Sequence, residues 1–345
     1  MRANKVYIQT AEQISIQQPL SEQWMVEPVF YEELFVKAQN PSFRDYLAAN
    51  EARRMSNIMK RALVTTTKVL EKTKIEHPDA IITGTSNGCL DYTEKFLDAM
   101  VDNKEQTLSP TYFMQSTHNT VGSAIGISTK THGYNTTYSH GGISFDLAIL
   151  DAWMQIQLGK ISTALVGGHD EMVDTYFSLL QKKKYVGLQG MVPCSEVAMA
   201  MMLNTDKSSD VLCEIAGISI CYQPSNKTIK DLLYRMLENV ELSLTDISAI
   251  LTGVNGNIAN DKPYYTIVDE FFSDKPLLHY KHLFGENFTA SALGLYAAAH
   301  ILKNNMIPSF VYDKKCIQQC KSLHNILFLN HTIEGNLSII LLRKV

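Results

Sequence analysis

The chain has 345 residues, of which 45% are hydrophobic and 19% charged, with a net charge of −4. This balance predicts a soluble globular protein with two domains or two packed halves, and the small charge does not favour nucleic-acid or membrane-surface binding. No apolar run approaches the ~18 residues of a membrane span, and the cysteines lack a CxxC spacing, which predicts a reduced cytoplasmic protein with buried thiols at Cys89, Cys194, Cys213, Cys221, Cys316 and Cys320.

The first half predicts alternating strands and helices around one central stretch, residues 135–170. Before it, the pattern predicts strands at 5–10 and 80–84, helices at 52–72, 91–101 and 120–131, and a loop at 109–119. The central stretch predicts a strand at 135–139, a turn at Gly141-Gly142, a helix at 143–158 and a strand at 163–166. The helix is apolar on nearly every face, so we expect it inside the protein.

The second half repeats this order more weakly. A polar break at 204–210 places a boundary between residues 205 and 206, which predicts two halves at 1–205 and 206–345. A strand at 212–220 and a helix at 228–240 follow. After Gly285 comes a helix rich in alanine and glycine, which lets another backbone approach closely. We expect this helix to pack at the centre against the helix at 143–158.

Three motif frames in this sequence resemble the β-ketoacyl-(acyl carrier protein) synthases of the thiolase superfamily, and the resemblance extends from residue 5 to about residue 343. Leu158-Gly159 and Gly167-Gly168 align with the nucleophile region and put Gly142 at the place of the nucleophilic cysteine. In 253–261, GVNGNIAND, the frame ending in Asn-Asp persists, but Gly253 takes the place of the first histidine. In 281–286, KHLFGE, Lys281 and the glycine match, but Glu286 takes the place of the second. Residues 330–338, NHTIEGNLS, stand where the family has a Gly-Phe-Gly-Gly loop.

The resemblance implies a thiolase-like α/β fold of five layers, α-β-α-β-α, with two pseudo-repeated halves. The cysteine and both histidines are absent, each from a motif whose other residues are retained. These three independent losses predict that the chain no longer catalyses condensation. Within the superfamily the chain resembles chain-length factors, inactive partners of ketosynthases, of the kind found in aryl-polyene and dialkylresorcinol-type pathways. This implies a non-catalytic, cytoplasmic subunit of a heterodimeric 3-oxoacyl synthase, with an active ketosynthase as partner. The acyl carrier protein is expected to contact it directly or through that partner, and no cofactor or metal is expected.

The same resemblance implies two groups of binding residues. The strand before the nucleophile position pairs across a two-fold axis in this family, which puts Tyr138, Ser139 and His140 at the dimer interface. The loop at 109–119 resembles the segment that lines the acyl tunnel, so Tyr112, Phe113 and Met114 are expected to line the tunnel or to lie in the core.

Two other readings of the sequence stay open. The first is an acyltransferase with a relocated nucleophile at Ser139 or Cys89, although Ser139 and His140 are neighbours on a strand and so point to opposite faces. The second is a homodimeric scaffold protein.

Two further features have simple structural explanations. The carboxylate of Glu286 could stabilise the start of a helix by facing its dipole. The lysines at 182–184 suit either a solvated face or a contact with an acidic carrier protein.

Overall fold

The computed structural model describes residues 4–106, 108–207, 210–314, 320 and 322–345. Its strands are β1 (Tyr7–Ile14), β2 (Ala80–Gly84), β3 (Tyr134–Tyr138), β4 (Thr163–Asp170), β5 (Val197–Asn204), β6 (Cys213–Tyr222), β7 (Ala249–Thr252), β8 (Leu277–His279), β9 (Asn325–His331) and β10 (Asn336–Arg343). Its α-helices are α1 (Ala49–Ala52), α2 (Asn57–Thr73), α3 (Leu90–Asp102), α4 (Pro110–Ser116), α5 (Thr120–Thr129), α6 (Ser144–Gln157), α7 (Asp174–Lys182), α8 (Asn226–Glu238), α9 (Ile258–Phe271), α10 (Lys281–Phe284) and α11 (Ser291–Asn304).

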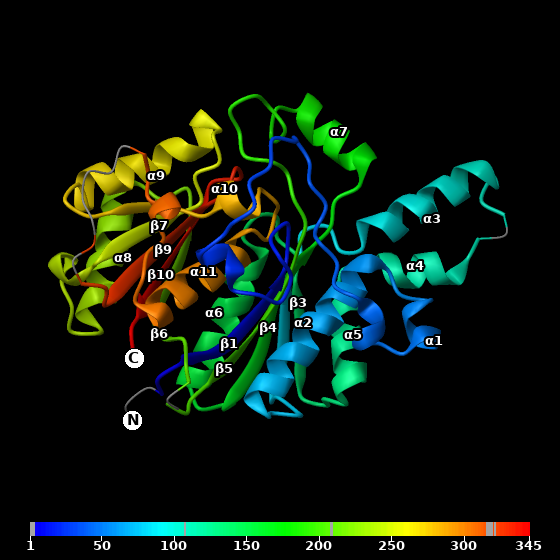
Figure 1. Cartoon of the computed structure of the whole chain (residues 1–345), viewed down its shortest axis with the longest axis horizontal. Helices are drawn as coiled ribbons and strands as arrows, with labels where there is room; N and C mark the ends of the chain where they lie inside the picture. The colour runs from blue at the N-terminus through cyan, green and yellow to red at the C-terminus, as the bar shows by residue number, and fades with distance from the viewer. Residues whose placement is uncertain (1–3, 107, 208–209, 315–319, 321) are drawn as a thin grey trace.

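The strands form a ten-stranded mixed sheet in the order β3-β2-β4-β5-β1-β6-β10-β9-β7-β8 (Figure 1). Read outward from the middle, the two halves run β1-β5-β4-β2-β3 and β6-β10-β9-β7-β8, the same order with each number raised by five. The halves meet at a short seam, where Tyr7 pairs with Glu214 and Ile8 with Cys213. The internal repeat predicted from the sequence is therefore present. The division into domains between residues 205 and 206 stays a prediction.

Helices α6 and α11 lie between the two halves. α6 contacts β2 and β4 of the first half and β6 of the second, while α11 contacts β9, β1 and α6 itself. α2 and α5 cover the outer face of the first half, and α8 and α9 that of the second. All residues of α11 from Ser291 to Leu302 are buried. A Cβ added to Gly294 would lie 2.5 Å from the Phe328 ring, so glycine permits the close approach of α11 to β9 that the small-residue pattern predicts.

Two predicted elements differ from the structure. The loop predicted at 109–119 contains helix α4, because Pro110 occupies its first turn with φ already suited to a helix, after Ser109 in an extended conformation. The long helix predicted from residue 52 begins at Asn57, since Ser56 is extended and interrupts the helical backbone. The thiols also differ in part: Cys221 and Cys320 are half-buried rather than buried, and Cys316 lies outside the described residues. No helix in the described ranges is both long and apolar enough to cross a membrane.

Candidate functional site

The place assigned to the nucleophilic cysteine is a tight glycine turn between β3 and α6. Gly141 has φ +57°, a left-handed conformation that favours glycine. At Gly142 an added Cβ would lie 3.1 Å from both Cβ and Cγ2 of Thr332. This position therefore has no nucleophile, and Thr332, which follows β9, would have to shift by a few tenths of an ångström to admit a side chain there.

The place assigned to the first histidine is filled in the same manner. Gly253 follows β7, and a Cβ there would lie 2.9 Å from Cε of Lys281 and 2.9 Å from the hydroxyl of Tyr264. The hydroxyl of Tyr280 would be 3.2 Å away. A histidine at residue 253 would have to displace three buried side chains.

The place assigned to the second histidine holds one member of a buried ion pair. Nζ of Lys281 lies 2.9 and 2.8 Å from the two carboxylate oxygens of Glu286, and the Asn255 amide donates to the same carboxylate. Lys281 is only 4% exposed. Backbone pairing of Glu286 with Cys194 fixes the carboxylate in this place. Glu286 therefore neutralises Lys281, and the helix-start role suggested by the sequence is wrong because α11 begins only at Ser291.

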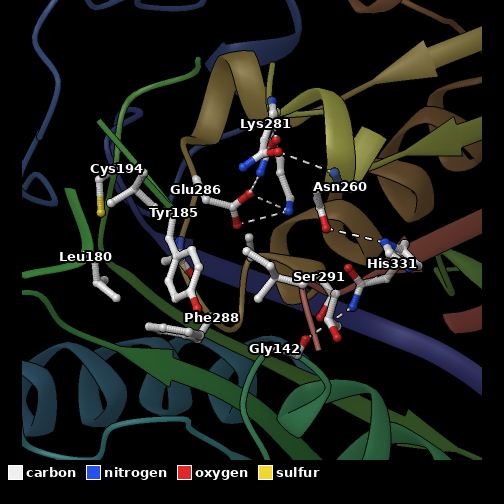
Figure 2. A pocket seen from close by; sticks show the side chains of 18 of the residues that line it. Gly142, Leu180, Tyr185, Cys194, Asn260, Lys281, Glu286, Phe288, Ser291 and His331 are labelled. Atoms are coloured by element: carbon white, nitrogen blue, oxygen red, sulfur yellow. Dashed lines mark hydrogen bonds and ion pairs between the residues drawn. The ribbon is translucent and has the colours of Figure 1, made fainter. Parts of the chain in front are cut away.

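Two of these positions, Gly142 and Glu286, line a pocket of about 70 Å³, and Lys281, which contacts the third, lines it too. Gly142, Lys281 and Glu286 line one side together with His331, and Leu180, Tyr185 and Phe288 line the opposite, apolar side (Figure 2). Such a volume holds a few water molecules and no extended acyl chain, because one water needs roughly 10–15 Å³ on the same measure.

His331 in this pocket was not singled out by the sequence analysis. It ends β9, and its Nδ1 lies 3.3 Å from Oδ1 of Asn260. Burial lowers the pKa of the imidazole, so the ring is neutral at pH 7. Its position at the carboxyl end of a buried apolar strand, in the segment 330–338 that replaces the family's glycine loop, is the sequence signal by which it could have been found.

Beneath the pocket, Asp146 of α6 joins the two halves. Its carboxylate accepts hydrogen bonds from Oγ of Ser291 at 2.7 Å and from Nδ2 of Asn330 at 2.9 Å. Burial raises the pKa of Asp146 to about 6. Asn330 also donates to the carbonyl oxygen of Gly142, at 3.3 Å. This network ties the glycine turn to α11 and β9 and therefore supports the pocket from below.

The two relocated nucleophiles considered from the sequence have unsuitable surroundings. Cys89 is fully buried, and burial raises the pKa of its thiol to about 12, so no thiolate forms near neutral pH. Oγ of Ser139 donates to the carbonyl of Ser86 at 3.2 Å, and no general base bonds to it among the described residues. His140 is exposed, and its backbone N–H donates a hydrogen bond to the Ser144 hydroxyl.

The residues expected at the tunnel and the interface lie outside the pocket. Tyr112, Phe113 and Met114 belong to α4, which forms with α3 a helical arm projecting from the body (Figure 1). The Tyr112 and Phe113 rings pack on Tyr92 and Phe96 of α3, yet Phe113 is 57% and Met114 62% exposed. Tyr138 ends the edge strand β3, and Ser139 and His140 follow it, before the glycine turn. Their roles in a tunnel or an interface stay predictions.

The model of the β-ketoacyl synthase N-terminal domain matches residues 22–249, more than half of the chain. The chain belongs to the β-ketoacyl synthase family. No curated protein sequence matches it. Among the described residues of this ketosynthase-family chain, no group of three or more histidine, cysteine, aspartate or glutamate side chains is arranged to hold a metal ion.

Solved structures share the whole fold. The ishigamide ketosynthase/chain length factor superposes with a TM-score of 0.83 at 15% identity, covering 99% of this chain and 100% of the other. The ketosynthase ApeO in complex with its chain length factor ApeC from Xenorhabdus doucetiae gives 0.80 at 13% identity, with 99% and 98% covered. A β-ketoacyl synthase from Burkholderia phymatum gives 0.78 at 14% identity, with 99% and 100% covered. The predicted thiolase-like fold is therefore confirmed.

Restoring the thiol alone should not restore chemistry. The wild-type chain should neither carry an acyl group nor condense, because Gly142 offers no thiol. Gly142→Cys should still fail to elongate, because Gly253 and Glu286 leave no imidazole at the other two positions. Intact-mass spectrometry after incubation with acylated carrier protein measures this. A stoichiometric acyl adduct on the wild-type chain, or an elongated product from the variant, would show that the site retains catalytic power.

Proposed function

We propose that this chain is a non-catalytic, chain-length-factor-like subunit that pairs with an active ketosynthase and helps to shape the acyl tunnel in polyene or fatty-acid-like synthesis. One observation carries the proposal: each of the three catalytic positions is both changed and occupied. Thr332 is in close contact with Gly142, and Lys281 and two tyrosines are in close contact with Gly253. Glu286 forms an ion pair with Lys281. Substitution at one position could be a variation, whereas changes at all three positions, each in close contact with neighbouring side chains, support a loss of the condensing chemistry.

The edge of the sheet supports a protein partner. The carbonyl of Tyr138 accepts a hydrogen bond from the N–H of Thr85, next to β2, so the backbone of Tyr138 and Thr136 faces the sheet. Backbone direction alternates along a strand, so the N–H and C=O groups of Asn135 and Thr137 face outward. An unpaired edge of this kind is a template for another strand. A partner strand running antiparallel to β3 would satisfy these groups.

The arm supports the same conclusion. No residue of α3 or α4 is buried, although both helices carry apolar side chains. Leu97 is 54% and Val101 77% exposed. α4 packs on α5, and α5 packs on β3, so the arm and the strand edge are neighbouring parts of one face. Apolar side chains left exposed on two neighbouring helices support a protein interface, and obligate interfaces bury roughly 2,000–5,000 Å².

Two similar structures are a ketosynthase/chain length factor and a ketosynthase in complex with its chain length factor. A third, with a TM-score of 0.77 at 12% identity, names an acyl carrier protein in complex with its ketosynthase. These arrangements support a ketosynthase partner for this chain, and a carrier protein directly or through that partner. The exposed lysines at 182–184, next to Tyr185 at the pocket, supply positive charge for an acidic carrier protein.

Co-expression tests the pairing. The chain should co-purify one to one with a ketosynthase that retains its cysteine and both histidines, encoded beside it, and acyl groups should load on that partner alone. Expressed by itself, the chain should be poorly soluble or form a makeshift homodimer. A stable monomer that binds no such ketosynthase, or acyl loading on this chain, would count against the proposal.

The tunnel role makes a separate prediction. Replacing Tyr112, Phe113 or Met114 by alanine in the heterodimer should lengthen the product by at least one two-carbon unit at one or more positions. Burying each further CH₂ of the acyl chain stabilises it by ~0.8 kcal/mol, whereas inserting one into filled space costs ~1–3 kcal/mol. A smaller side chain at the end of the tunnel should therefore let the acyl chain grow longer before elongation stops. Mass spectrometry of the products measures it, with Phe30→Ala as a control away from the arm. An unchanged length for all three folded, co-purifying variants would leave the subunit a stabilising partner only.

A further inference from the structure

Two buried acids, Asp170 and Glu171, stand next to each other at the carboxyl end of β4. Arg61, the cation that acts on Glu171, is itself paired with Glu196, at 2.9 Å. Burial raises the pKa of Asp170 to about 6 and that of Glu171 to about 7. A buried carboxylate without a cation of its own is costly unless hydrogen bonds stabilise it, so the donors that these two acids engage show what they hold.

Asp170 binds the loop that leads from β2 to α3. Its Oδ1 accepts hydrogen bonds from the N–H of Ser86 at 2.9 Å, from the N–H of Asn87 at 3.1 Å and from the hydroxyl of Thr85 at 2.8 Å. The same loop is joined to the edge strand β3, because the N–H of Thr85 donates to the carbonyl of Tyr138 at 3.0 Å. Asp170 therefore fixes the loop from which the arm starts, next to the end of β3.

Glu171 binds the first turn of α3 itself. Its Oε1 accepts a hydrogen bond from the N–H of Asp91 at 3.0 Å. The N–H groups of a first turn have no partner within the helix, and the helix dipole favours a carboxylate there. No residue of α3 is buried, and the helix packs chiefly on α4, which is tied to the body by the side chain of Gln115 on the carbonyl of Arg54. Few contacts therefore fix the direction in which α3 projects (Figure 1).

We propose that Glu171, supported by Asp170, is a positioning residue for the arm: it holds α3 in a fixed direction relative to β3, so that both parts of the docking face meet the partner together. An arm that is fixed beforehand need not be ordered on binding, and this strengthens the affinity. The docking part of the inference rests on the proposed pairing with a ketosynthase. The holding of α3 concerns this chain alone.

Amide hydrogen exchange of the full chain at pH 7, read by mass spectrometry, tests the holding of α3 with α9 as the internal reference. Glu171→Leu removes the acceptor and should speed exchange in α3 roughly tenfold relative to α9. Glu171→Gln keeps an acceptor oxygen and should restore the wild-type rate. Glu214→Leu is the matched control, because Glu214 is also a buried acid but pairs with Lys5 at the seam of the sheet. It should not change exchange in α3 relative to α9.

Co-purification with the ketosynthase supplies the second readout, in which Glu171→Leu should bind roughly tenfold more weakly and Glu171→Gln like the wild type. Unchanged α3 exchange in folded Glu171→Leu, or equal acceleration in Glu171→Gln or Glu214→Leu, would overturn the holding of α3. Faster exchange with undiminished pairing would overturn the role in docking.

Two further outcomes are also decisive. If the wild-type chain binds no ketosynthase, the proposed function fails and the role in docking with it, while the exchange comparison still decides whether Glu171 holds α3. If Glu171→Leu does not fold, Glu171→Asp takes its place in both measurements. Its shorter side chain withdraws the acceptor from the N–H of Asp91 and keeps the charge beside Arg61, so it should likewise speed exchange in α3 and weaken pairing.

Discussion

Lys281→Met should lower the free energy of unfolding by about 3–5 kcal/mol, because it leaves the Glu286 carboxylate in a buried place without its cation. The remaining donor to that carboxylate is the Asn255 amide, which carries no charge. Urea unfolding of the purified chain, or of its complex, at pH 7 measures the loss. The effect is large because Lys281 is only 4% exposed and its Nζ contacts both carboxylate oxygens of Glu286, so the variant leaves that carboxylate with a single neutral donor.

Two comparisons make this prediction specific. The double variant Lys281→Met/Glu286→Gln should recover most of the loss, since the amide needs no counter-charge and can still accept from Asn255. Lys95→Met breaks the exposed pair of Lys95 with Asp91 and should cost about 0–1 kcal/mol. If Lys281→Met costs no more than Lys95→Met, or if the two changes at Lys281 and Glu286 are simply additive, the ion pair does not hold the filled site together.

Phe113→Asp should abolish co-purification with the ketosynthase partner while leaving this chain folded. Phe113 is 57% exposed in the isolated chain, so a charge there should change the free energy of unfolding by no more than about 0.5 kcal/mol. In a buried interface the same charge would lose its water, and central aromatic residues typically contribute about 2 kcal/mol or more. That corresponds to a roughly 30-fold or greater loss of affinity.

Phe30→Asp is the matched control, because Phe30 is 58% exposed and likewise packs against neighbouring rings, His282 and Phe310. Its ring contacts are with His282 of α10 and with Phe310, and not with the arm or β3, so the substitution should leave pairing intact. Size-exclusion chromatography of the co-expressed proteins compares both variants with the wild type. Equal loss of the partner in both variants, or none in either, would mean that the arm is not the docking surface.

Much of the fold follows from local sequence patterns. The apolar helix at 143–158 and the small-residue helix after Gly285 were predicted at the centre, and both lie there as α6 and α11. Helical periodicity and glycine placement depend on residues a few positions apart, so they can be read without the tertiary structure. Helix α4 was missed because the resemblance suggested a loop, although Ser109-Pro110 is a helix-start signal in its own right.

The sequence by itself also predicted which catalytic residues are missing, because Gly142, Gly253 and Glu286 each stand within a short motif frame that resembles the family's. Only the tertiary structure decided what stands in their place. Thr332 reaches Gly142, and Tyr264 and Lys281 reach Gly253, across separations that no local pattern encodes. The same is true of His331, which meets Asn260 in the pocket only because β9 ends beside α9. Occupancy of a space depends on side chains from distant elements packing together, and the chain order does not specify those contacts.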